Sequence, residues 1–333
     1  MNKERYKEFC KSEEDMPIFS CDWWLDSVCG VDNWDVALFE KGGHIYASMP
    51  YYNLKKGWFN LSIMPKLTQT LGIYIKYPND QKYYKKISWE KKSMSAILHS
   101  LPKTDHFSQS FHRKLNNWLP FYWAGYEQTT KYSYLIEATA DGSMDLVEDG
   151  FENDIRRRIK KTISGGVEVF EGEDIGLFYE LNKLTFARKG MDIPYSFEFI
   201  KKLYKNCKEN NAVKMFFAKD KNGAILAASF LVHDKGAVYY LMGGIDPVKK
   251  ELGAMDLVLY KSIEFAMQSN RTFDFEGSMI ESIEKYFRSF GAIQTPYYNI
   301  SKTSSKSLKI LIPFLSKSML GAGVTSLVKK MLK

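Results

Sequence analysis

Alternating apolar and polar positions predict a β-hairpin of the same design in each half of the chain. The segments VALFEKGGHIYAS (36–48) and FFAKDKNGAILAA (216–228) align without a gap at an offset of 180 residues (216 − 36). In both, an apolar run meets a turn of lysine and glycine, which supplies the positive φ that tight hairpins need. A Leu-Gly pair follows each hairpin, at 71–72 and 252–253. Two hairpins can converge on one turn chemistry, but the repeated Leu-Gly pair favours an internal duplication.

The rest of the first half is predicted to mix short helices and strands. Apolar residues at helical spacing indicate helices over 3–12, 20–29 and 89–101, the last closed by Pro102. Strand patterns indicate the first hairpin at 35–39 and 44–52, a strand over 58–64, and another hairpin at 121–126 and 132–138.

The second half begins with helices and continues with strands. The basic amphipathic segment FENDIRRRIKKTIS (151–164) predicts a helix that stops at a Gly-Gly pair. We expect the following elements after it: helices 174–187 and 195–209, hairpin 213–233, strand 237–245, helix 253–268, strand 272–278, helix 280–291 and strand 295–301. This order indicates a mixed α/β (α+β) fold around a largely antiparallel sheet.

Length and composition indicate a globular protein of two domains. The chain has 333 residues, of which 45% are hydrophobic and 26% charged. Its first residues, MNKERYKEFCKSEED, contain no apolar run of the kind that directs secretion, so we expect a cytoplasmic protein. Its four cysteines show no spacing typical of a metal site, and we expect free thiols and no metal.

The positive charge is concentrated at the carboxyl end. The net charge is +8, and the residues after Glu284 contain nine lysines and arginines but no acidic residue, so the remainder sums to about −1 (8 − 9). Residues 303–333 form an apolar and basic tail that is too interrupted to span a bilayer. This tail is expected either to dock reversibly on the inner membrane face or to pack on the protein. Anionic lipid, tRNA and phosphate-bearing substrates would all be attracted to it.

Four segments of the second half resemble one enzyme superfamily: AASFLVHDKGAVYYLMGGIDP (227–247), ELGAMDLVLYKSIEFAMQSN (251–270), FDFEGS (273–278) and EKYFRSFGA (284–292). Together they resemble the GCN5-related N-acetyltransferase (GNAT) superfamily, and within it the FemAB-like aminoacyltransferases of the peptidoglycan interpeptide bridge. The resemblance implies two tandem GNAT-like domains, each with a mixed, largely antiparallel sheet flanked by helices. Residues 1–150 would be a degenerate acceptor-binding domain, and 151–302 the catalytic domain.

The resemblance also implies how a donor is held. Strands 237–245 and 272–278 would splay apart and hold an activated acyl donor beside an amine. The loop that cradles the pyrophosphate of acetyl-coenzyme A falls on Lys250–Met255, where only the central glycine of the pattern Arg/Gln-x-x-Gly-x-Gly/Ala is kept. Aminoacyl-tRNA and acyl-coenzyme A therefore both remain candidate co-substrates, with no tightly bound cofactor. Donor contacts are expected from Gly243, Gly244, Gly253, Ala254 and Lys285.

Two carboxylates and one arginine are the candidate catalytic residues. In the strand FDFEGS, Asp274 and Glu276 share one face and could act as a base or as an anchor for the amine. Alternatively, Asp274 pairs with a basic residue and Glu276 caps the next helix. In FemAB-like enzymes a lysine follows a phenylalanine and adds positive charge at the transition state, and here Arg288 takes that place. Its alternative is a solvated helix face shared with Lys285.

The acceptor is expected to be large and phosphate-bearing. By resemblance, arginines near the start of the second domain hold the diphosphate of the acceptor, and the candidates are Arg156, Arg157 and Arg188, with Tyr240 contacting the substrate. A basic helix face is also typical of simple solvation, and a tyrosine of core packing.

The sequence therefore predicts an acyltransferase that moves an aminoacyl or acyl group to an amine of a cell-wall or capsule precursor. One alternative is an acyl-coenzyme A-dependent N-acyltransferase of a sugar amine in polysaccharide synthesis. Another is a non-catalytic protein that binds a lipid-linked precursor.

Overall fold

A computed structural model describes residues 2–248, 253–277 and 279–310. The chain divides into two compact units. Unit 1 takes residues 1–13, 19–131 and 297–333, and unit 2 takes 14–18 and 132–296. The sequence placed the domain boundaries at 150 and 302, whereas the observed divisions fall inside two long strands, β6 (Glu127–Ile136) and β12 (Ile293–Thr303).

Unit 1 is a mixed sheet with helices. Its strands follow the order β1-β2-β3-β5-β12, with β4 beside β2, and the pairing is antiparallel except between β3 and β5. Its elements are α1 (Asn2–Ser12), α2 (Asp22–Val28), β1 (Trp34–Lys41), β2 (His44–Lys56), β3 (Phe59–Ile63), β4 (Tyr74–Ile75), α3 (Tyr83–Ser100), β5 (His106–Ser110) and α4 (Leu119–Trp123). A short 3-10 helix, η1 (Ile18–Ser20), follows α1. Within it, the chain passes from the short unit 2 segment 14–18 back to unit 1.

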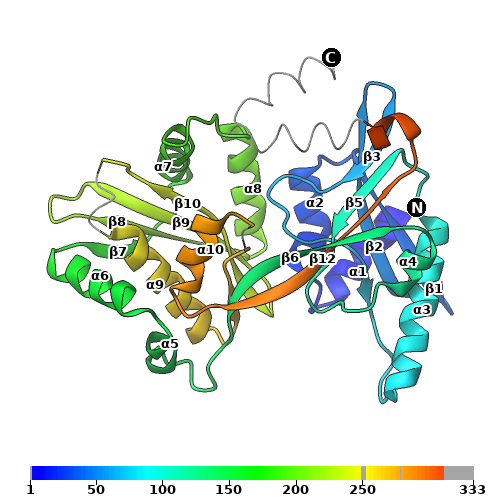
Figure 1. The fold of residues 1–333 in the computed structure, drawn as a ribbon, viewed down its shortest axis with the longest axis horizontal. Helices are drawn as coiled ribbons and strands as arrows, with labels where there is room; N and C mark the ends of the chain where they lie inside the picture. Colours follow the sequence, from blue (N-terminus) through cyan, green and yellow to red (C-terminus); the bar gives the residue numbers. More distant parts are fainter. Residues whose placement is uncertain (1, 249–252, 278, 311–333) are drawn as a thin grey trace. The chain divides into compact units, whose positions relative to one another are not determined.

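The strands of unit 2 are also mixed and follow the order β6-β11-β10-β9-β8-β7. Figure 1 labels β7 to β10 and the helices α5 to α10 of this unit. Among the strand pairs of unit 2 that the structure describes, only β10 and β11 are parallel. Its elements are α5 (Asp145–Asp149), α6 (Asn153–Ser164), β7 (Glu168–Glu171), α7 (Ile175–Ala187), α8 (Phe197–Glu209), β8 (Val213–Lys219), β9 (Ile225–His233), β10 (Ala237–Ile245), α9 (Ala254–Gln268), β11 (Thr272–Asp274) and α10 (Glu281–Arg288).

Helices cover both faces of the unit 2 sheet. On β9, Ser229 shares a hydrogen bond of 3.0 Å with Ser262 of α9, while the neighbouring Phe230 packs against Phe178 of α7. Successive strand residues point to opposite faces, so α9 and α7 lie on opposite sides of the sheet. The α9 side holds a large buried core that also includes Phe273, Phe275 and Phe287.

The two hairpins of the repeat are present, and so is the predicted fold class, because each unit holds mixed, largely antiparallel strands of one sheet flanked by helices. Hairpins β1–β2 and β8–β9 each carry a register shift near the turn, at Phe39/Glu40 and at Ala218/Lys219. The glycines of the two Leu-Gly pairs both have positive φ, +82° at Gly72 and +67° at Gly253, although Leu252 is outside the described residues. The two copies therefore share backbone geometry as well as sequence.

The predicted hairpin over 121–126 and 132–138 is wrong. Residues 119–123 form α4 instead, and a single long strand, β6, follows it. Pro120 lies in the first turn of α4, where its fixed φ suits a helix and its missing N–H costs nothing. The fully buried Phe121 then anchors this short helix in the core of unit 1.

The described helices are all too short or too polar to serve as a membrane span. In the part of the chain that the structure describes, no helix is both long and apolar enough to cross a bilayer. The predicted basic tail lies mostly in residues 311–333, which are outside the described residues.

Replacing Gly72 with alanine should destabilise unit 1 more than the same change at Gly43. Their φ angles are nearly equal, at +82° and +81°, so each alanine costs about 1–2 kcal/mol in backbone strain. At Gly72 a Cβ would also lie 2.5 Å from Phe111 Cδ1, whereas at Gly43 it would meet nothing within 4 Å. Displacing the buried Phe111 should add about 2 kcal/mol. Equal losses of unfolding free energy in urea titrations would contradict this account.

Candidate functional site

Strands β10 and β11 stay paired over only three residues each. Ala237–Tyr239 pairs with Thr272–Asp274, after which β10 continues to Ile245 while β11 ends. β11 is also paired with β6, and the chain stays beside β6 after Asp274, where the Phe275 N–H donates to the Tyr134 carbonyl at 3.0 Å. The backbone of β10 beyond Tyr239 therefore has no partner in β11, which is the divergence of central strands that the sequence predicted.

A strained turn follows β11 and lies tightly against β6. Glu276 has a φ of +60° and Gly277 a φ of +64°. A Cβ on Gly277 would collide with the Tyr132 carbonyl and would lie 2.7 Å from Ser133 Cα. A positive φ at a glutamate costs about 1–3 kcal/mol, and such strain is concentrated at functional sites. The predicted strand 272–278 ends early for this reason.

The turn places two carboxyl groups together in a buried position. Asp274 is 2% exposed, and its Oδ1 accepts hydrogen bonds from the Ser133 hydroxyl and, at 2.8 Å, from the Glu276 N–H. Glu276 Oε1 is shielded from solvent and has no hydrogen-bond partner among the described residues. Burial, with a further contribution from Asp274, raises the pKa of Glu276 well above its ordinary value. Glu276 is thus a half-buried residue whose carboxyl oxygen Oε1 is shielded from solvent and accepts no hydrogen bond from the described residues.

The alternative role proposed for Glu276, a cap on the next helix, does not account for its position. The residue that precedes α10 is Ile280, and no side chain caps that helix. Glu276 is therefore not the cap. Ser133, which holds Asp274, was missed by the sequence analysis because it lies on β6, 141 residues away in the chain.

The glycines at the end of β10 are required by packing. The Gly243 carbonyl accepts a hydrogen bond of 2.7 Å from Asn182 Nδ2 of α7, and a Cβ on Gly244 would lie 2.7 Å from the Asn182 backbone nitrogen. A Cβ on Gly243 would collide with the phenol oxygen of Tyr240. Tyr240 also packs edge-on against Phe287, and burial raises its pKa. Tyr240 therefore fills the space beside the diverging strands.

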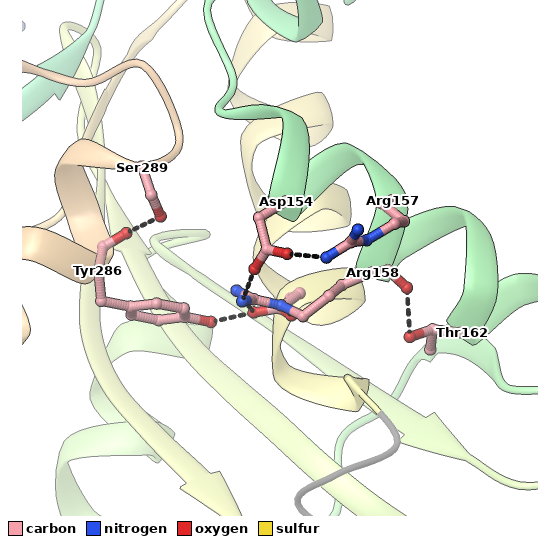
Figure 2. A network of polar contacts seen from close by, with 7 residues as sticks. Asp154, Arg157, Arg158, Thr162, Tyr286 and Ser289 are labelled. Carbon is pink, nitrogen blue, oxygen red and sulfur yellow. Dashed lines mark hydrogen bonds and ion pairs between the residues drawn. The ribbon is translucent and has the colours of Figure 1, made fainter.

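A polar network joins α6, α9 and α10 (Figure 2). Asp256, in the first turn of α9, accepts from Arg158 Nε at 2.7 Å and from the Tyr286 hydroxyl at 2.7 Å. Arg158 also donates to Asp154 at 2.5 Å. The sequence analysis named none of these residues as site residues. The signals for them were an arginine among three consecutive arginines and an aspartate at the start of an otherwise apolar helix.

The other predicted basic residues are on the surface. Arg156 donates to Asn153 and Arg157 to Asp154, both at 2.6 Å along the same helix. Arg288 pairs with Glu284 at 2.9 Å. Arg188 and Lys285 are exposed as well. The structure thus brings Asp274 and Glu276 together, places Tyr240 over Gly243, and places Gly253 and Ala254 at the start of α9.

Residues 150–288 match the family model described as an acetyltransferase (GNAT) domain. Residues 150–288 of this chain are thus a GNAT acyltransferase domain. The matched range contains β10, β11, α9, α10 and the Asp274–Glu276 pair. No curated protein matches the chain.

Solved structures show the FemAB-like fold of this acyltransferase. The crystal structure of FemX has a TM-score of 0.67 and 12% identity, with 94% of this chain and 98% of that chain covered. The structure of L-PGS from Bacillus licheniformis has a TM-score of 0.55 and 11% identity, covering 92% and 94%. The C-terminal domain of a putative lysylphosphatidylglycerol synthetase from Agrobacterium fabrum has a TM-score of 0.53 and 13% identity, covering 93% and 94%.

Replacing Glu276 with glutamine should change how the stability of the acyltransferase depends on pH. Because the folded pKa is raised, the protonated carboxyl stabilises the fold fully below the ordinary glutamate pKa of about 4.3, and this stabilisation is lost as pH rises through the raised pKa. The glutamine variant lacks this loss. The unfolding free energy of the glutamine variant, relative to wild type, should therefore increase from pH 4 to pH 8. The increase should be about 1.4 kcal/mol for each pH unit that lies between the unfolded and folded pKa values of Glu276.

Urea titrations from pH 4 to pH 8 measure this difference in unfolding free energy. The exposed Glu281 is the control position, where the same change should leave the pH profile as it is in the wild type. Parallel wild-type and E276Q profiles would refute the assignment.

Proposed function

We propose that this GNAT protein transfers an aminoacyl group from an activated ester to a primary amine on a phosphate-bearing cell-wall or capsule precursor. The observation that carries the proposal is the buried, unpartnered Oε1 of Glu276 at the point where β10 and β11 separate. A primary amine is mostly protonated at neutral pH, and besides that ammonium proton it must lose a second proton as it attacks. A buried carboxyl group with a raised pKa is suited to take that proton.

The proposed reaction needs no covalent enzyme intermediate. The amine nitrogen attacks the carbonyl carbon of the donor, the C–N bond forms and the bond from carbon to the leaving oxygen breaks. The ammonium proton is lost to solvent before attack, and the second proton, which leaves the nitrogen as the C–N bond forms, passes to Glu276 and then to the leaving oxygen. The N–H groups of β10 beyond Tyr239 have no β11 partner, and they are the candidate donors to the oxyanion. Asp274, fixed by Ser133, positions the Glu276 turn.

The choice of an aminoacyl donor is supported by the related folds. One of these solved structures is the C-terminal domain of a putative lysylphosphatidylglycerol synthetase, and lysylphosphatidylglycerol is an aminoacylated phospholipid. A phosphate-bearing acceptor also suits the exposed Arg156, Arg157 and Arg188. tRNA is the proposed carrier of the donor. We place the protein in the cytoplasm, with the basic tail as its contact to the inner membrane face.

A second candidate function is acyl-coenzyme A-dependent acylation of a sugar amine. The observation in its favour is the match to a family model described as an acetyltransferase domain. A precursor-binding protein without catalysis is the remaining alternative, and the buried carboxyl pair argues against it.

The activity test supplies radiolabelled alanyl-, seryl-, glycyl- and lysyl-tRNA with a UDP-linked muropeptide that has a free lysine amine, and acetyl-coenzyme A with glucosamine in parallel. Product from the first pair supports the proposal, and product from the second pair alone favours the second candidate. E276Q should lower kcat by about 100-fold to 10,000-fold with little change in KM, as expected for loss of a general base. E281Q is the matched control on the surface of α10. Unchanged turnover in E276Q would remove Glu276 from the mechanism.

A further inference from the structure

The first turn of α9 has the electrostatics of an anion site. Gly253, in a left-handed conformation, precedes this helix of fifteen residues, and the N–H groups at the start of a helix attract negative charge. In this chain a carboxylate is already there. Asp256 lies in that first turn, its residue is 6% exposed, and its Oδ2 is 3.7 Å from the point where a Gly253 Cβ would be.

The Asp256 carboxylate is held by strong partners on both oxygens. Arg158 Nε donates to Oδ2 at 2.7 Å, and Tyr286 donates to Oδ1 at 2.7 Å (Figure 2). Arg158 Nη2 lies 3.5 Å from Oδ1, so the guanidinium faces the carboxylate with two of its nitrogens. Such paired, charge-assisted contacts are stronger than neutral hydrogen bonds. The Arg158 guanidinium, which lies beside the start of α9, is therefore already paired with Asp256 and Asp154.

The space between α6 and the start of α9 is also filled by side-chain atoms. A Cβ on Gly253 would collide with Thr162 Oγ1, so α6 lies against the start of α9. The Thr162 hydroxyl is oriented by its own hydrogen bond, 2.8 Å long, to the Arg158 carbonyl. Arg158 and Thr162, four residues apart, thus present one face of α6 to the α9 terminus.

We propose that Asp256 is a built-in anion that holds the Arg158 guanidinium beside the start of α9, and so determines the class of donor. A pyrophosphate placed here would meet a carboxylate instead of a free guanidinium. The residues beside the start of α9 therefore do not fit the pyrophosphate of coenzyme A. The donor is an ester that brings no pyrophosphate to α9, as an aminoacyl ester does. This inference deepens the proposed function and rests on it for the chemistry of transfer.

The test measures binding without any transfer reaction. Inorganic pyrophosphate and coenzyme A are titrated into the full chain by calorimetry, for the wild type and for Asp256→Asn, which keeps the side-chain shape but frees Arg158. We expect neither probe to saturate the wild type, and D256N to bind pyrophosphate at least about tenfold more tightly. Asp154→Asn is the matched control, because it removes the other, more exposed carboxylate partner of Arg158 and should bind no better than wild type.

A double variant identifies the residue responsible for any gain. Adding Arg158→Met to D256N should abolish the new affinity, because the freed guanidinium is then gone. If D256N does not fold, as judged by circular dichroism, Asp256→Ser takes its place and keeps a hydroxyl for Tyr286.

Two results would overturn the inference: wild-type binding of coenzyme A that pyrophosphate displaces, or no gain in any folded Asp256 variant. Failure of aminoacyl transfer would count against the proposed function alone, because these titrations involve no donor ester and no acceptor.

Discussion

The separation of the chain from β10 after Asp274 is the constraint on which the rest of unit 2 depends. A parallel pair that continued to Ile245 would satisfy the β10 backbone and leave no place for a strained turn. The chain instead stays bonded to β6 through Phe275, and Gly277 packs closely against Tyr132 and Ser133. The turn that carries Glu276 therefore lies where β10 no longer has β11 beside it.

The two acidic sites of unit 2 differ in how their charge is balanced. Asp256 is matched by a guanidinium and a phenol, so its burial is compensated and its position is fixed. Glu276 is next to another acid and lacks a partner for Oε1 among the described residues, so its burial is uncompensated. A compensated carboxylate suits a permanent structural or selective role, whereas an uncompensated one suits exchange of a proton with a ligand.

The parts of the fold that follow from local pattern could be predicted from the sequence. The hairpin at 213–233, strand 237–245 and helix 253–268 have strong periodicity and clear glycine turns, and each is present. Helix α4 was missed because its five residues are too short to show a period, so the aromatic run FYW resembled a strand. The Asp274–Ser133 and Arg158–Asp256 contacts join residues 141 and 98 positions apart, and no local pattern reports such pairs. The positive φ of Glu276 is likewise imposed by contact with β6.

Strands β6 and β12 each contribute residues to both units, and this limits where the chain can be cut. A fragment of residues 151–302 would keep the Glu276 turn but lose Ser133 and the whole of β6. The complementary piece would lose most of the β12 residues that pair with β5. Neither piece would therefore carry all the strands of one unit, so a truncation meant to isolate one half also removes part of the sheet of the other.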